Sequence, residues 1–178
     1  MSATLPPWEP LWEVHTRLER AGIAHALGAS ALLHALGLWD HVGDWDVNVE
    51  ADHDVLGPLL ADLAPVKFGS SGIHADSKLQ LFDAQVEVIV RMAIVAEGQV
   101  VRIPTLPASA WRGVPVGSPE AWAVAYALLG RAEKSELLFR SLASGGARSG
   151  AVERMLAEPL PAELAARLRR LPVAPRGR

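Results

Sequence analysis

Two aspartates separated by one residue, Asp44 and Asp46, are the side chains of this sequence best placed to do chemistry. The segment 44–49 alternates polar and apolar residues, as a half-buried β-strand does. Successive side chains of a strand point to opposite faces, so both carboxylates would share one face, and Trp45 and Val47 the other. Neighbouring carboxylates repel each other unless a cation lies between them, and Mg²⁺ commonly takes one or two carboxylates together with substrate phosphates. The pair therefore predicts a Mg²⁺ (or Mn²⁺) site for phosphoryl or nucleotidyl transfer, with a solvated strand face as the alternative.

In a two-metal site, two closely spaced ions stabilise both the attacking and the leaving oxygen. Holding two ions requires a third acid beside Asp44 and Asp46. Glu87 is the leading candidate, as the one acid in the apolar segment 86–90. The alternative is that Glu87 faces solvent while its apolar neighbours face the core. Asp83 is the second candidate, although the sequence Asp83-Ala84-Gln85 is typical of a turn.

A phosphate site is predicted just before the two aspartates. The apolar segment 23–27 reads as a strand, Gly28-Ala29-Ser30 as a turn of small residues, and 31–38 as a helix. A strand, a small-residue turn and a helix start bring backbone N–H groups and the positive end of a helix dipole to one point, which suits an anion. Gly28 would let the backbone approach closely, and Ser30 would cap the helix or donate to a phosphate.

These residues resemble the nucleotidyltransferase superfamily of DNA polymerase beta type. The resemblance rests on Gly28-Ala29-Ser30, on Asp44-x-Asp46 and on a later acid within a strand. It is strongest for the minimal bacterial nucleotidyltransferases, including aminoglycoside nucleotidyltransferase-like and antitoxin-system members. A second segment, residues 114–134, resembles the start and the turn of their C-terminal helix pair, so the likeness extends over about residues 23–142.

The resemblance implies an α+β fold, in which a mixed sheet is flanked by helices and followed by a C-terminal helical segment. It implies an NTP held through Mg²⁺ on Asp44 and Asp46, with the third acid, Glu87, acting as base or metal ligand. The residues implied to bind the nucleotide are Gly28, Ala29, Ser30, Arg131 and Lys134. The last two would neutralise phosphate or contact the acceptor. Their alternative role is an exposed surface at a helix end.

Two departures from the family pattern keep a second function open. Many members carry an Arg and a Thr or Ser just before Asp-x-Asp, where this chain has Asp40 and Val42. A catalytically degenerate nucleotide-binding or regulatory module is therefore the alternative to a transferase. For the transferase, the expected acceptor is a hydroxyl on a small molecule, an RNA end or a protein.

Composition sets the remaining expectations. The chain has 178 residues, no cysteine and a formal net charge of −3, which argues against an extensive nucleic-acid-binding surface. It shows neither a secretory signal nor an apolar run of membrane-spanning length, so a cytoplasmic location is expected. The expected organisation is an α/β core over residues 1–113, a helical extension over 114–171 and a disordered tail over 172–178.

Several element boundaries are predicted as well. Segments 79–82 and 86–92 read as a hairpin, 100–103 as a further strand and 104–115 as irregular. Ser118 and Pro119 mark a helix start, as N-cap and first helical residue.

Overall fold

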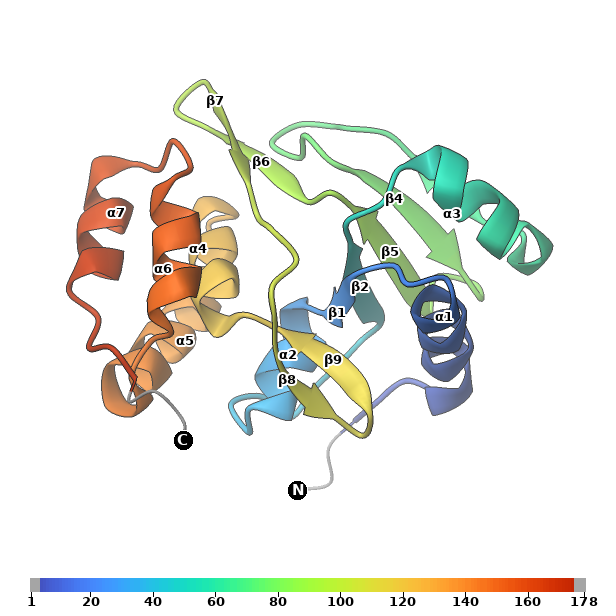
Figure 1. Ribbon diagram of the computed structural model, residues 1–178, viewed down its shortest axis with the longest axis horizontal. Helices are drawn as coiled ribbons and strands as arrows, with labels where there is room; N and C mark the ends of the chain where they lie inside the picture. The colour runs from blue at the N-terminus through green and yellow to red at the C-terminus, as the bar shows by residue number, and fades with distance from the viewer. Residues whose placement is uncertain (1–3, 175–178) are drawn as a thin grey trace.

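The computed structural model describes residues 4–174 and contains one mixed sheet flanked by helices (Figure 1). The strand order is β3-β4-β5-β2-β1-β9-β8. β2 runs parallel to β5 and β1 parallel to β9, whereas the other neighbours are antiparallel. The strands are β1 (His25–Leu27), β2 (Trp45–Val49), β3 (Val66–Phe68), β4 (Ser77–Leu81), β5 (Val86–Val90), β8 (Pro107–Trp111) and β9 (Val114–Gly117), while β6 (Ala93–Ala96) and β7 (Gln99–Arg102) form a separate pair. The predicted α+β class with a mixed sheet is confirmed.

The C-terminal helices gather into a bundle beside the sheet, on the left of Figure 1. The helices are α1 (Trp8–Arg20), α2 (Ala29–Ala35), α3 (His53–Leu60) with a short 3-10 turn after it, α4 (Pro119–Leu128), α5 (Ala132–Gly145), α6 (Ser149–Leu156) and α7 (Ala162–Arg169). As predicted, Ser118 is the N-cap of α4, and its hydroxyl accepts a hydrogen bond from the Ala121 N–H. No helix in residues 4–174 is long and apolar enough to cross a membrane.

Strand β2 is an inner strand of the sheet, and its side chains alternate between the two faces as the sequence predicts. Trp45 is 1% exposed and Val47 is fully buried. The indole N–H of Trp45 donates to the Pro7 carbonyl at 2.8 Å, which ties the start of α1 to the strand. Because this face is committed to the core, Asp44 and Asp46 project from the other one.

The hairpin of β4 and β5 positions the third acid. The two strands pair antiparallel, from Leu81 opposite Val86 to Ser77 opposite Val90. Three consecutive turn residues, Phe82, Asp83 and Ala84, have φ values of 53°, 52° and 66°. This left-handed stretch reverses the chain tightly and fixes which β4 residue lies beside each β5 residue.

The prediction that residues 104–115 are irregular is wrong, because β8 and the start of β9 form a hairpin there. Its turn uses Arg112 and Gly113 at φ values of 50° and 85°. Arg-Gly is a weaker hairpin signal than Asn-Gly or Asp-Gly, which explains why the sequence concealed it. Since β9 pairs with β1, the sheet extends beyond residue 113 into the segment expected to be helical.

Two other boundaries differ from expectation. The predicted strand 86–92 is interrupted at Arg91, where φ is 49°, and β6 begins two residues later. Residues 172–174 were expected to be disordered, but the Pro172 carbonyl accepts from the Ala147 N–H at 2.7 Å and the Ala174 N–H donates to the Ala147 carbonyl at 2.8 Å. The rest of the predicted tail, 175–178, lies outside the described residues.

Candidate active site

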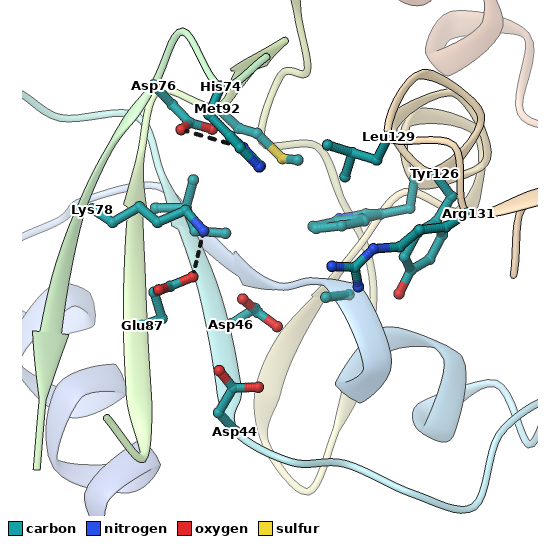
Figure 2. A pocket seen from close by; sticks show the side chains of 13 residues that line it. Asp44, Asp46, His74, Asp76, Lys78, Glu87, Met92, Tyr126, Leu129 and Arg131 are labelled. Carbon is teal, nitrogen blue, oxygen red and sulfur yellow. Dashed lines mark hydrogen bonds and ion pairs between the residues drawn. The ribbon is translucent and has the colours of Figure 1, made fainter. Parts of the chain in front are cut away.

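The predicted acids meet in one cavity, which we call the acidic pocket. Asp46 lies on β2 directly beside Glu87 on the parallel strand β5, and Asp44 immediately precedes β2. All three line a cavity of about 160 Å³, together with residues from β4, β5, α4 and the start of α5. Figure 2 shows the carboxylates of Asp44 and Asp46 at one end of this cavity, with Glu87 beside them.

The electrostatics of the pocket favour a cation. Burial raises the pKa of Asp46 to about 7, and the nearby charges of Asp44 and Glu87 add to the effect. The pKa of Asp44 is also raised, mainly by burial and then by Glu87. The charges of Lys78 and Arg131 act in the opposite direction but do not offset the effect of burial, so the ionised form of each aspartate is only partly compensated. A cation between them would relieve this, so the donor set fits Mg²⁺ with two carboxylates and the remaining positions open to phosphate or water.

The third acid is already engaged by a cation. Lys78 on β4 donates through Nζ to Glu87 Oε2 at 2.7 Å, and Gln80 Nε2 donates to Glu87 Oε1 at 3.2 Å. In residues 4–174, no three His, Asp or Glu side chains are grouped tightly enough to hold a metal by themselves. Asp83, the other candidate, is exposed in the hairpin turn and does not line the pocket.

Gly28 does not line the acidic pocket, and its backbone N–H is bonded within the protein. The Gly28 N–H donates to the Asp46 carbonyl at 2.9 Å, which occupies this donor. A Cβ at Gly28 would come within 2.0 Å of the Trp122 ring, so the close approach that requires glycine here is to an indole. Ala29 does line the pocket, with φ at 44°. Ser30 neither caps α2, whose N-cap position is Gly28, nor lines the pocket.

Of the two predicted basic residues, Arg131 lines the pocket and Lys134 does not. Arg131 lies just before α5, and its charge lowers the pKa of both aspartates against the effect of burial. Lys134 Nζ lies 4.9 Å from the centre of the Trp39 ring and 5.6 Å from that of Tyr126, and burial lowers the pKa of this lysine.

The two departures from the family pattern lie outside the cavity. Asp40 is exposed and Val42 is buried in the core. Neither residue lines the acidic pocket, so the negative charge of Asp40 does not enter it.

The comparisons with known proteins concern the architecture. No protein-family model and no curated protein matches the sequence. Among solved structures, a Thermotoga maritima protein proposed to be a nucleotidyltransferase is 20% identical, with a TM-score of 0.56 over 79% of this chain and 96% of that one. The antibiotic-resistance factor ANT(2″)-Ia matches in its solution structure, at 14% identity and a TM-score of 0.55 over 90% of each chain. Its crystal structure with adenylyl-2″-tobramycin matches at 13% identity and a TM-score of 0.56, over 89% of this chain and 94% of that one. The chain has a nucleotidyltransferase fold.

Within this nucleotidyltransferase fold, sequence reasoning missed four polar residues that line the pocket: His74, Asp76, Lys78 and Tyr126. Asp76 directly precedes β4 and Lys78 lies within it, so their side chains point to the same face. The register of the β4–β5 hairpin places Lys78 diagonally across from Glu87, but the sequence does not reveal this register. Tyr126 was hidden in an apolar helical pattern. His74 precedes β4 in an irregular segment, and its sequence context carries no signal.

Proposed function

We propose that this protein is a nucleotidyltransferase that moves a nucleoside monophosphate from an NTP to a hydroxyl acceptor, with Mg²⁺ (or Mn²⁺) held by Asp44 and Asp46. One observation carries the proposal. Asp44 and Asp46 both line the acidic pocket together with Glu87, and Asp46 lies in register with Glu87 across the parallel pair of β2 and β5. The raised pKa of each aspartate indicates a charge that a bound cation would balance.

The reaction would form a bond between the acceptor oxygen and the α-phosphorus while the bond from that phosphorus to pyrophosphate breaks. Pyrophosphate leaves with the electron pair, and the hydroxyl proton passes to Glu87. Each oxygen of this carboxylate can accept a further hydrogen bond beside those from Lys78 and Gln80. Arg131 and Lys78 supply fixed positive charge to the phosphate chain. Bound Mg²⁺ would supply Lewis-acid stabilisation of the phosphate oxygens.

The size of the pocket indicates that only part of the nucleotide would lie inside it. Sites for whole drug-sized ligands usually measure about 300–1,000 Å³, whereas the acidic pocket measures about 160 Å³. It would therefore enclose the ion and part of the phosphate chain, with the nucleoside at the rim. Among the acceptors left open by the sequence, a small molecule gains support from the ANT(2″)-Ia structure, which contains the adenylylated small molecule adenylyl-2″-tobramycin.

Calorimetric titration with a nonhydrolysable ATP analogue tests this proposal. The intact protein should bind the analogue with Mg²⁺ and lose most of that affinity in EDTA. Asp46→Asn should weaken Mg²⁺-dependent binding at least tenfold, because it removes one of two metal carboxylates at constant size. Asp40→Asn, at an exposed acid outside the pocket, is the matched control and should bind as the wild type does. Metal-independent binding, or none, in the wild-type protein would refute the proposal.

The ion pair between Lys78 and Glu87 favours a second candidate, a nucleotide-binding module without turnover. A lysine bound to the third acid competes with its use as a base. In that case Mg²⁺-dependent nucleotide binding would persist, but no pyrophosphate would be released in the presence of polyol, RNA or protein acceptors. Pyrophosphate release with any of these acceptors, abolished by Glu87→Gln, would reject the second candidate.

A further inference from the structure

Unsatisfied polar groups gather in the acidic pocket. In residues 4–174, buried side-chain atoms without a hydrogen-bond partner belong to Asn48, His74, Asp76, Thr105, Tyr126 and Arg148. Three of these residues, His74, Asp76 and Tyr126, line this one pocket. A buried polar atom without a partner costs roughly 1–3 kcal/mol, so proteins rarely keep one without a reason. Because three such residues line the same pocket, we expect a ligand to supply their missing hydrogen bonds.

The three unsatisfied residues lie at two ends of the pocket. Tyr126 lies on the wall formed with Arg131, near the aspartates, and its phenol carries a raised pKa through burial and the charge of Asp46. His74 and Asp76 lie at the far end, with Lys78 between them and the aspartates, as Figure 2 shows. The proposed nucleotide phosphates are assigned to the first end, beside the aspartates and Arg131, which leaves the second end without an assigned ligand.

Asp76 is the most unusual group at the far end. It is 5% exposed, and Oδ1 has no hydrogen-bond partner. Oδ2 accepts only a long bond, 3.4 Å, from the Ala93 N–H. His74 Nδ1 lies 3.8 Å from Asp76 Oδ1, the contact dashed in Figure 2; this distance allows an ion pair when the imidazole is protonated but is too long for a hydrogen bond, so neither atom has a hydrogen-bond partner. Two facing polar atoms are thus held just beyond hydrogen-bonding distance.

The charge around Asp76 sets the chemistry of its ligand. The pocket holds four carboxylates, Asp44, Asp46, Asp76 and Glu87, against the two permanent cations Lys78 and Arg131. Lys78 is already bound to Glu87 at 2.7 Å. Burial raises the pKa of Asp76, which agrees with a carboxyl group whose one hydrogen bond from another residue is long. A donor group would be stabilised at this position, whereas a further anion would be repelled.

We propose that Asp76 and His74 form the acceptor-binding end of the pocket and recognise a hydrogen-bond donor, hydroxyl or ammonium, on a small uncharged or cationic acceptor. This inference rests on the proposed transferase function, because it assigns the end of the pocket that the nucleotide does not need. The donor bonds to Asp76 Oδ1, and His74 Nδ1 bonds to a neighbouring polar group of the same molecule. The acceptor hydroxyl that reacts would then point past Lys78 toward Glu87 and the aspartates.

The same geometry disfavours an RNA end as acceptor. A 3′-hydroxyl is followed closely by a phosphodiester anion, which would have to enter beside Asp76 and Glu87. Charges of one sign a few ångströms apart repel by about 1 kcal/mol even in water and by more at a protein surface.

Methionine methyl groups provide a direct readout of this end of the pocket. Met92 lines the pocket next to His74 and Asp76, whereas Met155 is fully buried in α6 and does not line it. With ¹³C-methyl methionine, the Met92 signal should report a ligand at the far end, and the Met155 signal should serve as an internal control. The protein is first saturated with Mg²⁺ and a nonhydrolysable ATP analogue, in a buffer free of amines and polyols.

Two probes of nearly equal shape are then titrated: tris(hydroxymethyl)aminomethane, which carries an ammonium and three hydroxyls, and pentaerythritol, which carries four hydroxyls. We expect at least one to shift the Met92 signal saturably at millimolar concentration without moving Met155. Stronger binding of the amine identifies the donor as ammonium, and equal binding identifies it as hydroxyl. Asp76→Asn should weaken the preferred probe at least tenfold, His74→Gln severalfold, and Asp40→Asn not at all.

Binding of the ATP analogue distinguishes a failure of the acceptor-site assignment from a failure of the transferase proposal. If the ATP analogue binds with Mg²⁺ but neither probe shifts Met92, the assignment of the far end is overturned while the transferase proposal stands. Unchanged probe binding by Asp76→Asn, or tighter binding of a short ribo-oligonucleotide with a free 3′-hydroxyl, overturns it too. If the analogue itself does not bind, the transferase proposal fails first. Asp76→Asn keeps the size of the side chain, and its unaltered affinity for the analogue would verify folding.

Discussion

Replacing Asp46 by Asn should stabilise the metal-free protein at alkaline pH. The folded protein raises the pKa of Asp46 from 3.8 to about 7. Between these values the folded state keeps a proton that the unfolded state has released, so rising pH favours unfolding. The stability that protonated Asp46 provides is complete below pH 3.8 and is lost as pH rises to about 7. Asn remains neutral and is spared this loss.

The size of the effect follows from the same two pKa values. Each pKa unit corresponds to about 1.36 kcal/mol, so a shift of about three units corresponds to about 4 kcal/mol. Asp44 and Glu87 share in this repulsion and can relax around Asn, so about 2–4 kcal/mol is expected above pH 7.5. Urea unfolding of wild type and Asp46→Asn, from pH 4.5 to pH 8.5 in EDTA, measures it. The advantage of the variant should grow with pH across this range.

Saturating Mg²⁺ should reduce the difference, because a ligand that binds the folded state stabilises the wild-type protein and binds the variant more weakly. Asp40→Asn, at an exposed acid, should show no pH-dependent gain. A variant that is no more stable than wild type at pH 8.5, or equally favoured at every pH, would show that the aspartates are not electrostatically strained.

Three further substitutions test the local structure of the elements that carry the site. Gly28→Ala should cost about 3 kcal/mol or more of unfolding free energy in urea titrations, because its Cβ would lie 2.0 Å from Trp122; a loss below 1 kcal/mol would contradict that contact. Ala29→Gly should stabilise the protein by about 1 kcal/mol in the same assay, since it relieves a φ of 44°, and a destabilised variant would argue against it. Ser118→Ala should lose about 1 kcal/mol or more in thermal unfolding, because it removes both the helix cap and the hydrogen bond that the hydroxyl donates to Glu120; unchanged stability would contradict this role of Ser118.

The sequence was most informative where a local pattern decides the outcome. The alternation around Trp45 correctly placed both aspartates on the face opposite the core, because burial of an indole and a valine commits one face of a strand. The Ser118-Pro119 start of α4 was equally readable, since capping depends on adjacent residues. The family resemblance added the sheet and the helical segment, which periodicity alone does not arrange.

Features that depend on distant parts of the chain were not readable. The reason for Gly28 is an indole from α4, and no local pattern announces that contact. Choosing between Glu87 and Asp83 required the parallel register of β2 and β5, which is set by the whole sheet. Lys78 remained unnoticed because its importance appears only when the hairpin register is known.

The left-handed turn at Phe82, Asp83 and Ala84 has a consequence for recognising related chains. Inserting or deleting one residue there would rotate the alternation of one strand and replace Glu87 in the pocket by a neighbouring valine. Selection for the proposed reaction would therefore conserve the length of this turn more strictly than its composition. A lysine nine residues before a glutamate, with the turn between them, should mark active relatives in which overall identity has fallen too low to be informative.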